Sequence, residues 1–209
     1  MSESTKTKVE TPDMRTQILA VATELFAADG FDATPLQAIS DRVGVAKPSL
    51  LYHFSSKDEL RRGVLDQVMA HWNGVLPRLM QAATTGEHRF DALISESIAF
   101  FTEDHDRARL LMRELLDRPA EMRALFRQYV GPWLTIMADY IRRGQQEAII
   151  YADVDPETYI IEVIQLMVTT IALGGVFDSL LIPSSDGSPR ARQLAEVTRI
   201  ARGALFIDA

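Results

Sequence analysis

Apolar residues along this chain recur at spacings of three and four, which is the period of an amphipathic helix. A proline occupies a plausible first helical position five times, at Pro12, Pro35, Pro119, Pro156 and Pro189, and helices accept proline in their first turn. We find no alternating run bounded by a hairpin dipeptide that would indicate a strand. The pattern therefore predicts an all-α protein of about nine helices.

The predicted helices follow these start signals closely. They cover approximately residues 12–29, 35–43, 46–53, a long helix from 56 that frays between Pro77 and Gly86, and then 87–103, 106–117, 119–147, 156–181 and 189–206. We expect a kink at Gly131-Pro132 inside the helix 119–147. Capping-box spacing is present at Thr34 with Gln37 and at Ser56 with Glu59.

The helices divide into two groups of different character. Three short helices precede residue 55, and a larger helical body follows. We therefore expect a disordered tail over 1–11, a domain of three short helices over 12–55, and a larger helical domain over 56–209. The polar run 184–188 has the composition of a linker.

Composition narrows the functional classes. The chain has 209 residues, of which 47% are hydrophobic and 24% charged, so it can bury a core. It has no cysteine, which excludes disulfides, thiolate zinc sites and cysteine nucleophiles and fits a reducing cytoplasm. The first ten residues lack an apolar signal region. Glu162, Gln165 and Asp178 interrupt the most apolar stretch, so we expect a soluble protein.

Residues 35–54, PLQAISDRVGVAKPSLLYHF, have the pattern of a helix-turn-helix. Gly44 provides the turn, and Ser40 is small where the two helices approach. Four apolar residues are spaced to form a common core with the first helix: Ile39, Val43, Val45 and Leu50. The second helix then presents hydrogen-bond donors that suit a major groove: Lys47, Ser49, Tyr52 and His53.

With this motif the chain resembles the TetR family of transcriptional regulators. The resemblance covers residues 16–60, TQILAVATELFAADGFDATPLQAISDRVGVAKPSLLYHFSSKDEL, including the Gly30-Phe31 turn and the Gly44-Val45 turn. It implies an amino-terminal DNA-binding domain, a carboxy-terminal helical domain for ligand binding and dimerisation, and repression that a small molecule relieves. It also implies double-stranded operator DNA, a small-molecule effector and a second copy of the chain as partners.

The resemblance assigns roles to individual residues of this segment. Thr34 matches a phosphate contact at the start of the second helix, and His53 and Lys57 match positions that hold phosphates. Lys47, Pro48 and Ser49 lie where the family's recognition helix meets bases and phosphates. The chain departs from the family at position 51, where Leu51 replaces the usual tyrosine and Tyr52 is the next residue. Leu51 either contacts a thymine methyl group or packs in the domain.

The formal net charge of −7 is unusual for a protein that binds nucleic acid. Residues 1–60 hold six basic and nine acidic side chains, whereas residues 42–62 hold five basic and two acidic ones. The positive charge is therefore local. We predict modest non-specific affinity for DNA, with a shallow salt dependence.

The larger helical domain contains aromatic and methionine residues. These residues either line a ligand cavity or belong to the hydrophobic core. The predicted pocket comprises Met69, Trp72, Phe100, Phe101, His105, Met112, Trp133, Met137, Tyr140, Met167 and Thr170. His71 is a further candidate for binding a polar ligand group. The cluster Glu103–Asp106 cannot converge on one ion, because adjacent residues of a helix point in different directions. We expect no metal and no cofactor.

The helix predicted over 156–181 is apolar nearly all round, so it must be covered on both sides. Together with the amphipathic last helix it resembles the family's dimerisation face, a four-helix bundle across a twofold axis. The alternative is a purely internal helix. The predicted interface comprises Ile160, Ile164, Val168, Ile171, Gly175, Leu194, Val197, Ala201 and Leu205.

The sequence thus favours a homodimeric DNA-binding repressor that leaves a palindromic operator when it binds a small apolar effector. The alternative is a helical small-molecule-binding or interaction protein that retains the helix-turn-helix as a scaffold. We do not expect an enzyme, because no nucleophile is paired with a base and no glycine-rich phosphate loop follows a strand.

Overall fold

The computed structural model describes residues 13–82, 86–183 and 187–207. Within these ranges the chain forms ten α-helices and one short 3-10 helix, and its only extended pairing is an isolated antiparallel bridge between Ile150 and Phe206. The all-α prediction is confirmed. The predictions for the tail 1–11 and for most of the linker-like run fall outside the described residues.

Internal contacts divide the chain into two units after Leu65. The first unit contains α1 (Met14–Asp29), α2 (Leu36–Val43), α3 (Lys47–His53) and the start of α4 (Lys57–Ala82). The division lies later than the boundary expected after residue 55, because Leu60 and Val64 of α4 are buried. A side chain at Gly63 would meet Phe54 and Leu19, so the start of α4 packs against the short helices.

The helix starts of the first unit follow the capping rules in part. Glu59 N donates to Ser56 Oγ at 3.0 Å, as predicted, although the Glu59 carboxylate accepts from Ser55 rather than from Ser56. The capping box predicted at Thr34 is wrong. Pro35 precedes α2 without a side-chain cap, and the Thr34 hydroxyl donates instead to Gly30 O at 2.7 Å.

The second unit contains the rest of α4 and the helices that follow it. These are α5 (Gly86–Glu103), α6 (His105–Asp117), α7 (Pro119–Tyr129), α8 (Gly131–Gln146), α9 (Pro156–Phe177), the 3-10 helix η1 (Asp178–Leu180) and α10 (Pro189–Gly203). The single kinked helix predicted over 119–147 is two helices, α7 and α8, separated at Val130. Pro132 has no N–H to continue the ladder, which favours a new helix start there.

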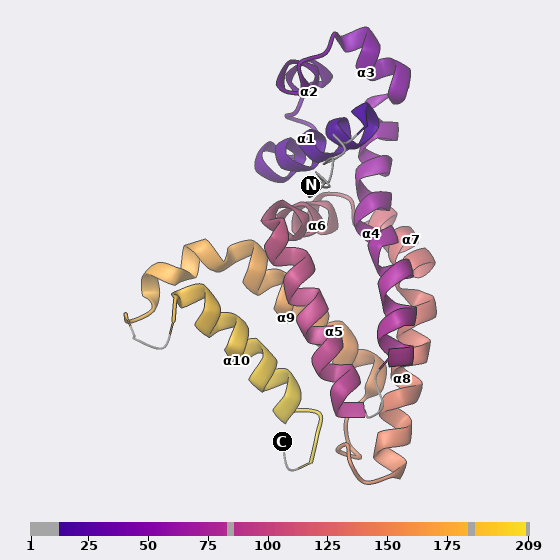
Figure 1. Cartoon of the computed structure of the whole chain (residues 1–209), viewed down its shortest axis with the longest axis vertical. Coiled ribbons are helices and arrows are strands. Elements are labelled where there is room, and N and C mark those ends of the chain that lie inside the picture. The colour runs from indigo at the N-terminus through magenta and orange to yellow at the C-terminus, as the bar shows by residue number, and fades with distance from the viewer. Residues whose placement is uncertain (1–12, 83–85, 184–186, 208–209) are drawn as a thin grey trace, which may run out of the picture. The chain divides into compact units, whose positions relative to one another are not determined.

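Helix α9 is central to the second unit, where it contacts α5, α6, α8 and α10 (Figure 1). Asp155 caps it by accepting a hydrogen bond from Thr158 N at 2.8 Å, as the proline signal predicted. By length and composition alone, Pro156–Leu180 is able to cross a membrane. Core helices of soluble proteins pass the same test, so this observation is weak evidence for a span.

Candidate nucleic-acid interface and ligand site

The turn between α2 and α3 is fixed by local backbone chemistry. Gly44 has φ +83°, a left-handed conformation that only glycine adopts without cost. Gly44 N and Val45 N both donate to Ser40 O, at 3.0 and 2.9 Å. Ile39, Ser40 and Leu50 are fully buried. The buried Leu50 therefore anchors the rear of α3, which packs against α2 as the helix-turn-helix pattern predicted.

The outer face of α3 is open. Lys47, Pro48 and Ser49 are exposed, and the side chain of Tyr52 is 88% exposed. Leu51 and His53 are half-buried, and the His53 ring meets the Tyr52 ring edge-on with centroids 5.5 Å apart. Within the described part of the chain no hydrogen bond occupies the polar ends of Lys47 and Tyr52. These donors are available to a partner outside the subunit.

Two of the residues predicted to contact phosphates, Thr34 and Lys57, are not exposed in the way that the α3 donors are. Thr34 is only 2% exposed, and its hydroxyl donates within the domain. Lys57 is half-buried, and its ammonium group lies 3.3 Å from Asp32 O and 4.4 Å from the centroid of the Phe31 ring. The structure does not bring the polar atoms of Thr34 and Lys57 to the open face of α3.

Several acidic side chains that make the domain's charge negative are bound to its own donors. Arg42 pairs with Glu24 at 2.7 Å, and Asp13 caps α1 through Thr16 N at 2.8 Å. Hydrogen bonds from Thr16 lower the pKa of Asp13, and those from Ser55 lower the pKa of Glu59. These carboxylates act as caps and pair partners, whereas the α3 face has none.

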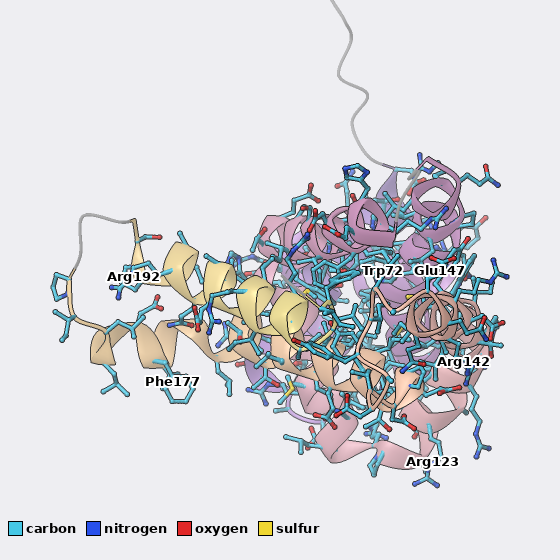
Figure 2. All side chains as sticks on the ribbon, turned by 90° about the horizontal axis from the view of Figure 1, so that it is seen from below. Trp72, Arg123, Arg142, Glu147, Phe177 and Arg192 are labelled. Carbon is cyan, nitrogen blue, oxygen red and sulfur yellow. The ribbon has the colours of Figure 1, made fainter. Side chains whose placement is uncertain are left out.

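In the second unit, three of the predicted pocket residues form one aromatic cluster. Trp72 of α4 meets Phe100 of α5 edge-on, with centroids 5.2 Å apart, and Phe101 lies 5.0 Å from Phe100. His71 stacks on Phe100 at 4.2 Å, and its Nε2 lies 3.2 Å from a carboxylate oxygen of Glu96. Figure 2 labels Trp72 among the crowded side chains of the helical body. An apolar surface thus lies beside an imidazole–carboxylate pair.

Two further hydrogen bonds tie α4 to its neighbours within the second unit. Tyr129 donates to Asp66 Oδ1 at 3.0 Å, and Trp133 Nε1 donates to Asn73 Oδ1 at 3.2 Å. Burial and the nearby carboxylate of Asp66 raise the pKa of Tyr129. Sequence reasoning did not identify Asp66, Asn73 or Glu96, because isolated polar residues on mixed helix faces carry no periodic signal.

The other predicted pocket residues have separate surroundings. Met69 and Met167 are buried, and Met112 Sδ lies 4.0 Å from the hydroxyl of Thr169. The Tyr140 ring carries the guanidinium groups of Arg89 and Arg143. Three other predicted residues, Trp133, Met137 and Thr170, are half-buried, and His105 is exposed in the first turn of α6.

The acidic residues at the start of α6 have hydrogen-bond and ion-pair partners in the same segment. Asp104 caps α6 by accepting from Asp106 N at 3.0 Å. Arg107 lies 3.8 Å from the Glu103 carboxylate and 3.5 Å from that of Asp104. In the described ranges no three His, Asp or Glu side chains are grouped as metal ligands. The junction is a helix start with paired charges.

The residues predicted for the dimer interface on α9 and α10 differ in their burial within the subunit. Most of the predicted residues are buried inside the subunit: Ile160, Val168, Ile171, Val197, Ala201 and Leu205. Ile164 and Gly175 are exposed and Leu194 is half-buried. The exposed large apolar side chains of α9 and η1 are Ile161, Ile164, Leu166, Leu173, Val176, Phe177 and Leu180. Figure 2 shows Phe177 pointing away from α10 at the projecting end of α9.

Comparisons with known proteins agree with this arrangement. The family model described as bacterial regulatory proteins, tetR family, matches residues 18–64. The HTH-type transcriptional activator FasR of Mycolicibacterium smegmatis is 32% identical over 99 residues, which are 47% of this chain and 45% of FasR. The HTH-type transcriptional repressor KstR2 of Rhodococcus jostii is 30% identical over 105 residues, which are 48% of this chain and 50% of KstR2.

The chain spans about half the length of these curated relatives in the matches. A solved structure extends the likeness to the fold of nearly the whole chain. The transcriptional regulator FadR from Bacillus subtilis, in complex with stearoyl-CoA, has a TM-score of 0.70 at 17% identity and covers 90% of this chain and 98% of its own. The match to the tetR family of bacterial regulatory proteins is therefore carried by the helix-turn-helix segment, residues 18–64.

Proposed function

We propose that this protein is a sequence-specific DNA-binding transcriptional repressor that binds its operator as a homodimer and releases it on binding a small apolar effector. The observation that carries the proposal is the contrast between the two sides of α3. Its rear is anchored by the buried Leu50, while Lys47, Ser49 and Tyr52 are exposed. A scaffold helix has no need of an open row of donors. A protein that acts on DNA in this way works in the cytoplasm.

In the proposed complex α3 lies in the major groove. Lys47 and Ser49 near its start reach base edges and phosphates, and His53 at its end holds a phosphate. Tyr52 supplies the phenolic hydroxyl that the family usually carries at position 51. The 88% exposure of Tyr52 and the half-buried position of Leu51 support this exchange of roles.

Dimerisation places two such helices on one face of the duplex. The exposed apolar side chains of α9, among them Leu173, Val176 and Phe177, form the proposed interface, because exposed apolar side chains grouped on one helix favour association. A twofold axis there would present two α3 helices about 34 Å apart, one helical turn of B-DNA. The operator is accordingly a palindrome.

The proposed effector binds beside the cluster of Trp72, Phe100 and Phe101. These rings offer an apolar surface to an acyl or ring-shaped ligand. FadR, the structural neighbour, was solved with stearoyl-CoA, so a long-chain acyl thioester is the first probe. Because α4 holds Trp72 and also begins in the DNA-binding unit, a ligand that biases α4 would bias the reading helix.

The test of DNA reading is a selection of genomic fragments by the purified protein. It is repeated with the double variant Lys47→Ala, His53→Ala and with Arg123→Ala, which removes an exposed cation from α7. We expect a palindrome that the wild type and the Arg123 variant recover and the double variant does not. Enrichment that survives in a folded, dimeric double variant would refute the assignment of α3 as the reading helix.

The test of the effector uses the two tryptophans of the chain, Trp72 and Trp133, which both lie in the second unit. Stearoyl-CoA is titrated into the wild type and into Phe100→Ala while tryptophan emission and operator affinity are followed. We expect saturable quenching and operator release in the wild type, both weakened in the variant. Quenching without any change in operator affinity would refute the proposed switch.

A further inference from the structure

The loop between α1 and α2 is held by hydrogen bonds to its own backbone carbonyl groups and to those at the end of α1. Gly30 has φ +86° and donates from its N–H to Phe26 O at 3.0 Å. The Thr34 hydroxyl donates to Gly30 O at 2.7 Å and lies 3.3 Å from Leu25 O. Thr34 N donates to Phe31 O at 3.3 Å. Since α2 begins directly after this loop, the loop determines how the helix-turn-helix leaves α1.

Phe31, at the tip of this loop, is held by two cations from α4. Lys57 Nζ lies 4.4 Å from the ring centroid and Arg61 Cζ lies 5.5 Å from it. Residues four apart on a helix share a face, so both cations approach from the same side of α4. The Phe26 ring lies 5.4 Å from Phe31 and supports it from α1. Three elements therefore meet at one aromatic ring.

The surroundings strengthen these contacts. Arg61 is only 5% exposed, and a cation–π contact gains strength when its cation is removed from water. Lys57 adds a hydrogen bond to Asp32 O at 3.3 Å in the same loop. One lysine thus contacts both the ring and the backbone of the α1–α2 loop, from the first turn of α4.

We propose that Phe31, Lys57 and Arg61 form a clamp that positions the reading helix relative to α4. In this proposal Lys57 is a positioning residue of the loop rather than a phosphate contact. The clamp makes the start of α4 and the helix-turn-helix move as one body. The inference rests on the proposed function, because a change in α4 reaches DNA only through such a coupling.

The two roles of Lys57 predict different responses to salt. Each phosphate that a protein neutralises adds about 0.9 to the slope of log affinity against log salt concentration. Removing a phosphate contact therefore flattens the slope, whereas loosening a clamp lowers affinity at every salt concentration alike. A double-mutant cycle separates the roles as well, since partners in one contact show non-additive effects.

The experiment uses the full chain with Phe31→Leu, Lys57→Met, both together, and Phe31→Tyr, which keeps an aromatic ring. Operator affinity is measured from 50 to 200 mM salt. We expect each of the first two variants to lose about fivefold and their combination little more than that, with the wild-type slope. Phe31→Tyr should bind within about twofold of the wild type, because its ring still accepts both cations.

A second readout does not depend on DNA. Hydrogen exchange of the Thr34 amide in the free protein should accelerate in Phe31→Leu and in Lys57→Met. It should not change in Arg62→Met, which removes an exposed neighbouring cation of α4. If the wild type binds no operator, the proposed function fails and this readout still tests the clamp.

Two results would overturn the proposal. The first is an additive loss of operator affinity with a flatter salt slope in Lys57→Met alone, which would make Lys57 a phosphate contact. The second is unchanged exchange of the Thr34 amide in Phe31→Leu and Lys57→Met, which would mean that the ring and the lysine do not hold the loop.

Discussion

Gly174 of α9 lies where the side chain of Arg190 crosses that helix. Arg190 Nη1 donates to Thr170 O at 3.0 Å, and Nη2 donates to Ile171 O at 2.7 Å. A Cβ atom on Gly174 would lie 1.4 Å from Nη1 and 2.7 Å from Cζ. Gly174→Ala therefore expels the guanidinium group, although alanine is the better helix former. We predict that this substitution destabilises the protein.

The magnitude follows from two opposed terms. Each hydrogen bond from a charged donor contributes about 1.5 kcal/mol, so the two lost bonds cost about 3 kcal/mol. Alanine in place of glycine returns about 1 kcal/mol in a helix interior. Arg190 Nε is buried without a hydrogen-bond partner in the described chain, so exposure of the displaced guanidinium recovers part of its solvation. After both offsets, the free energy of unfolding should fall by about 1 kcal/mol.

The assay is urea unfolding at fixed protein concentration, since the stability of the proposed dimer would depend on concentration. Gly74→Ala in α4 is the matched control, because a Cβ atom built on this exposed glycine has nothing within 4 Å beyond its own helix backbone and chain neighbours. It should stabilise the protein by about 1 kcal/mol. In an Arg190→Ala background, Gly174→Ala should stabilise too. A stabilising Gly174→Ala with Arg190 intact would refute the reasoning.

Three further predictions concern other parts of the chain. Ala148 has φ +55°, so Ala148→Gly should raise the free energy of unfolding by about 0.5–1 kcal/mol in urea, and a loss would contradict this. Hydrogen bonds from Ser55 lower the pKa of Glu59, so the stabilisation by Glu59 is present above the pKa of an unfolded glutamate and is lost at lower pH. The difference in free energy of unfolding between the wild type and Glu59→Gln should therefore shrink in urea titrations from pH 7 to pH 3. A difference that stays constant would show that these hydrogen bonds do not stabilise the protein. Phe177→Ser should weaken dimerisation in sedimentation experiments and Leu116→Ser, on exposed α6 surface, should not, whereas equal effects would locate the interface elsewhere.

The helix-turn-helix was predictable because its rules are local. Only glycine is free of cost at the left-handed turn of Gly44, and the spacing of Ile39 and Leu50 around it permits one buried side. The structure confirms both features. The same spacing accounts for Leu51 and Tyr52. Successive residues of a helix are 100° apart, so only one of these two neighbours can face fully outward.

The exposed apolar face of α9 was not predictable in the same way. A helix that is apolar nearly all round has no period from which to choose a face, so the choice depends on tertiary packing. Ile160 and Ile171 face the subunit core, whereas Val176 and Phe177 face outward. Similarly, the break at Val130 depends on how α7 and α8 pack, since Gly131-Pro132 favours a kink and a new helix start alike.

The predicted DNA contacts show the same dependence on neighbours. Lys47 and Lys57 are both lysines at positions that resemble the family's contacts, yet their surroundings differ. The outer face of α3 has no neighbouring element within the first unit, so Lys47 is exposed, whereas the first turn of α4 faces the α1–α2 loop, where Phe31 and Asp32 engage Lys57. A lysine that already has partners must break them before it can reach a phosphate, and this cost lowers its net contribution to DNA binding. The internal partners of a side chain, which no single sequence displays, therefore decide whether a position in a DNA-binding domain reads DNA or positions the residues that do.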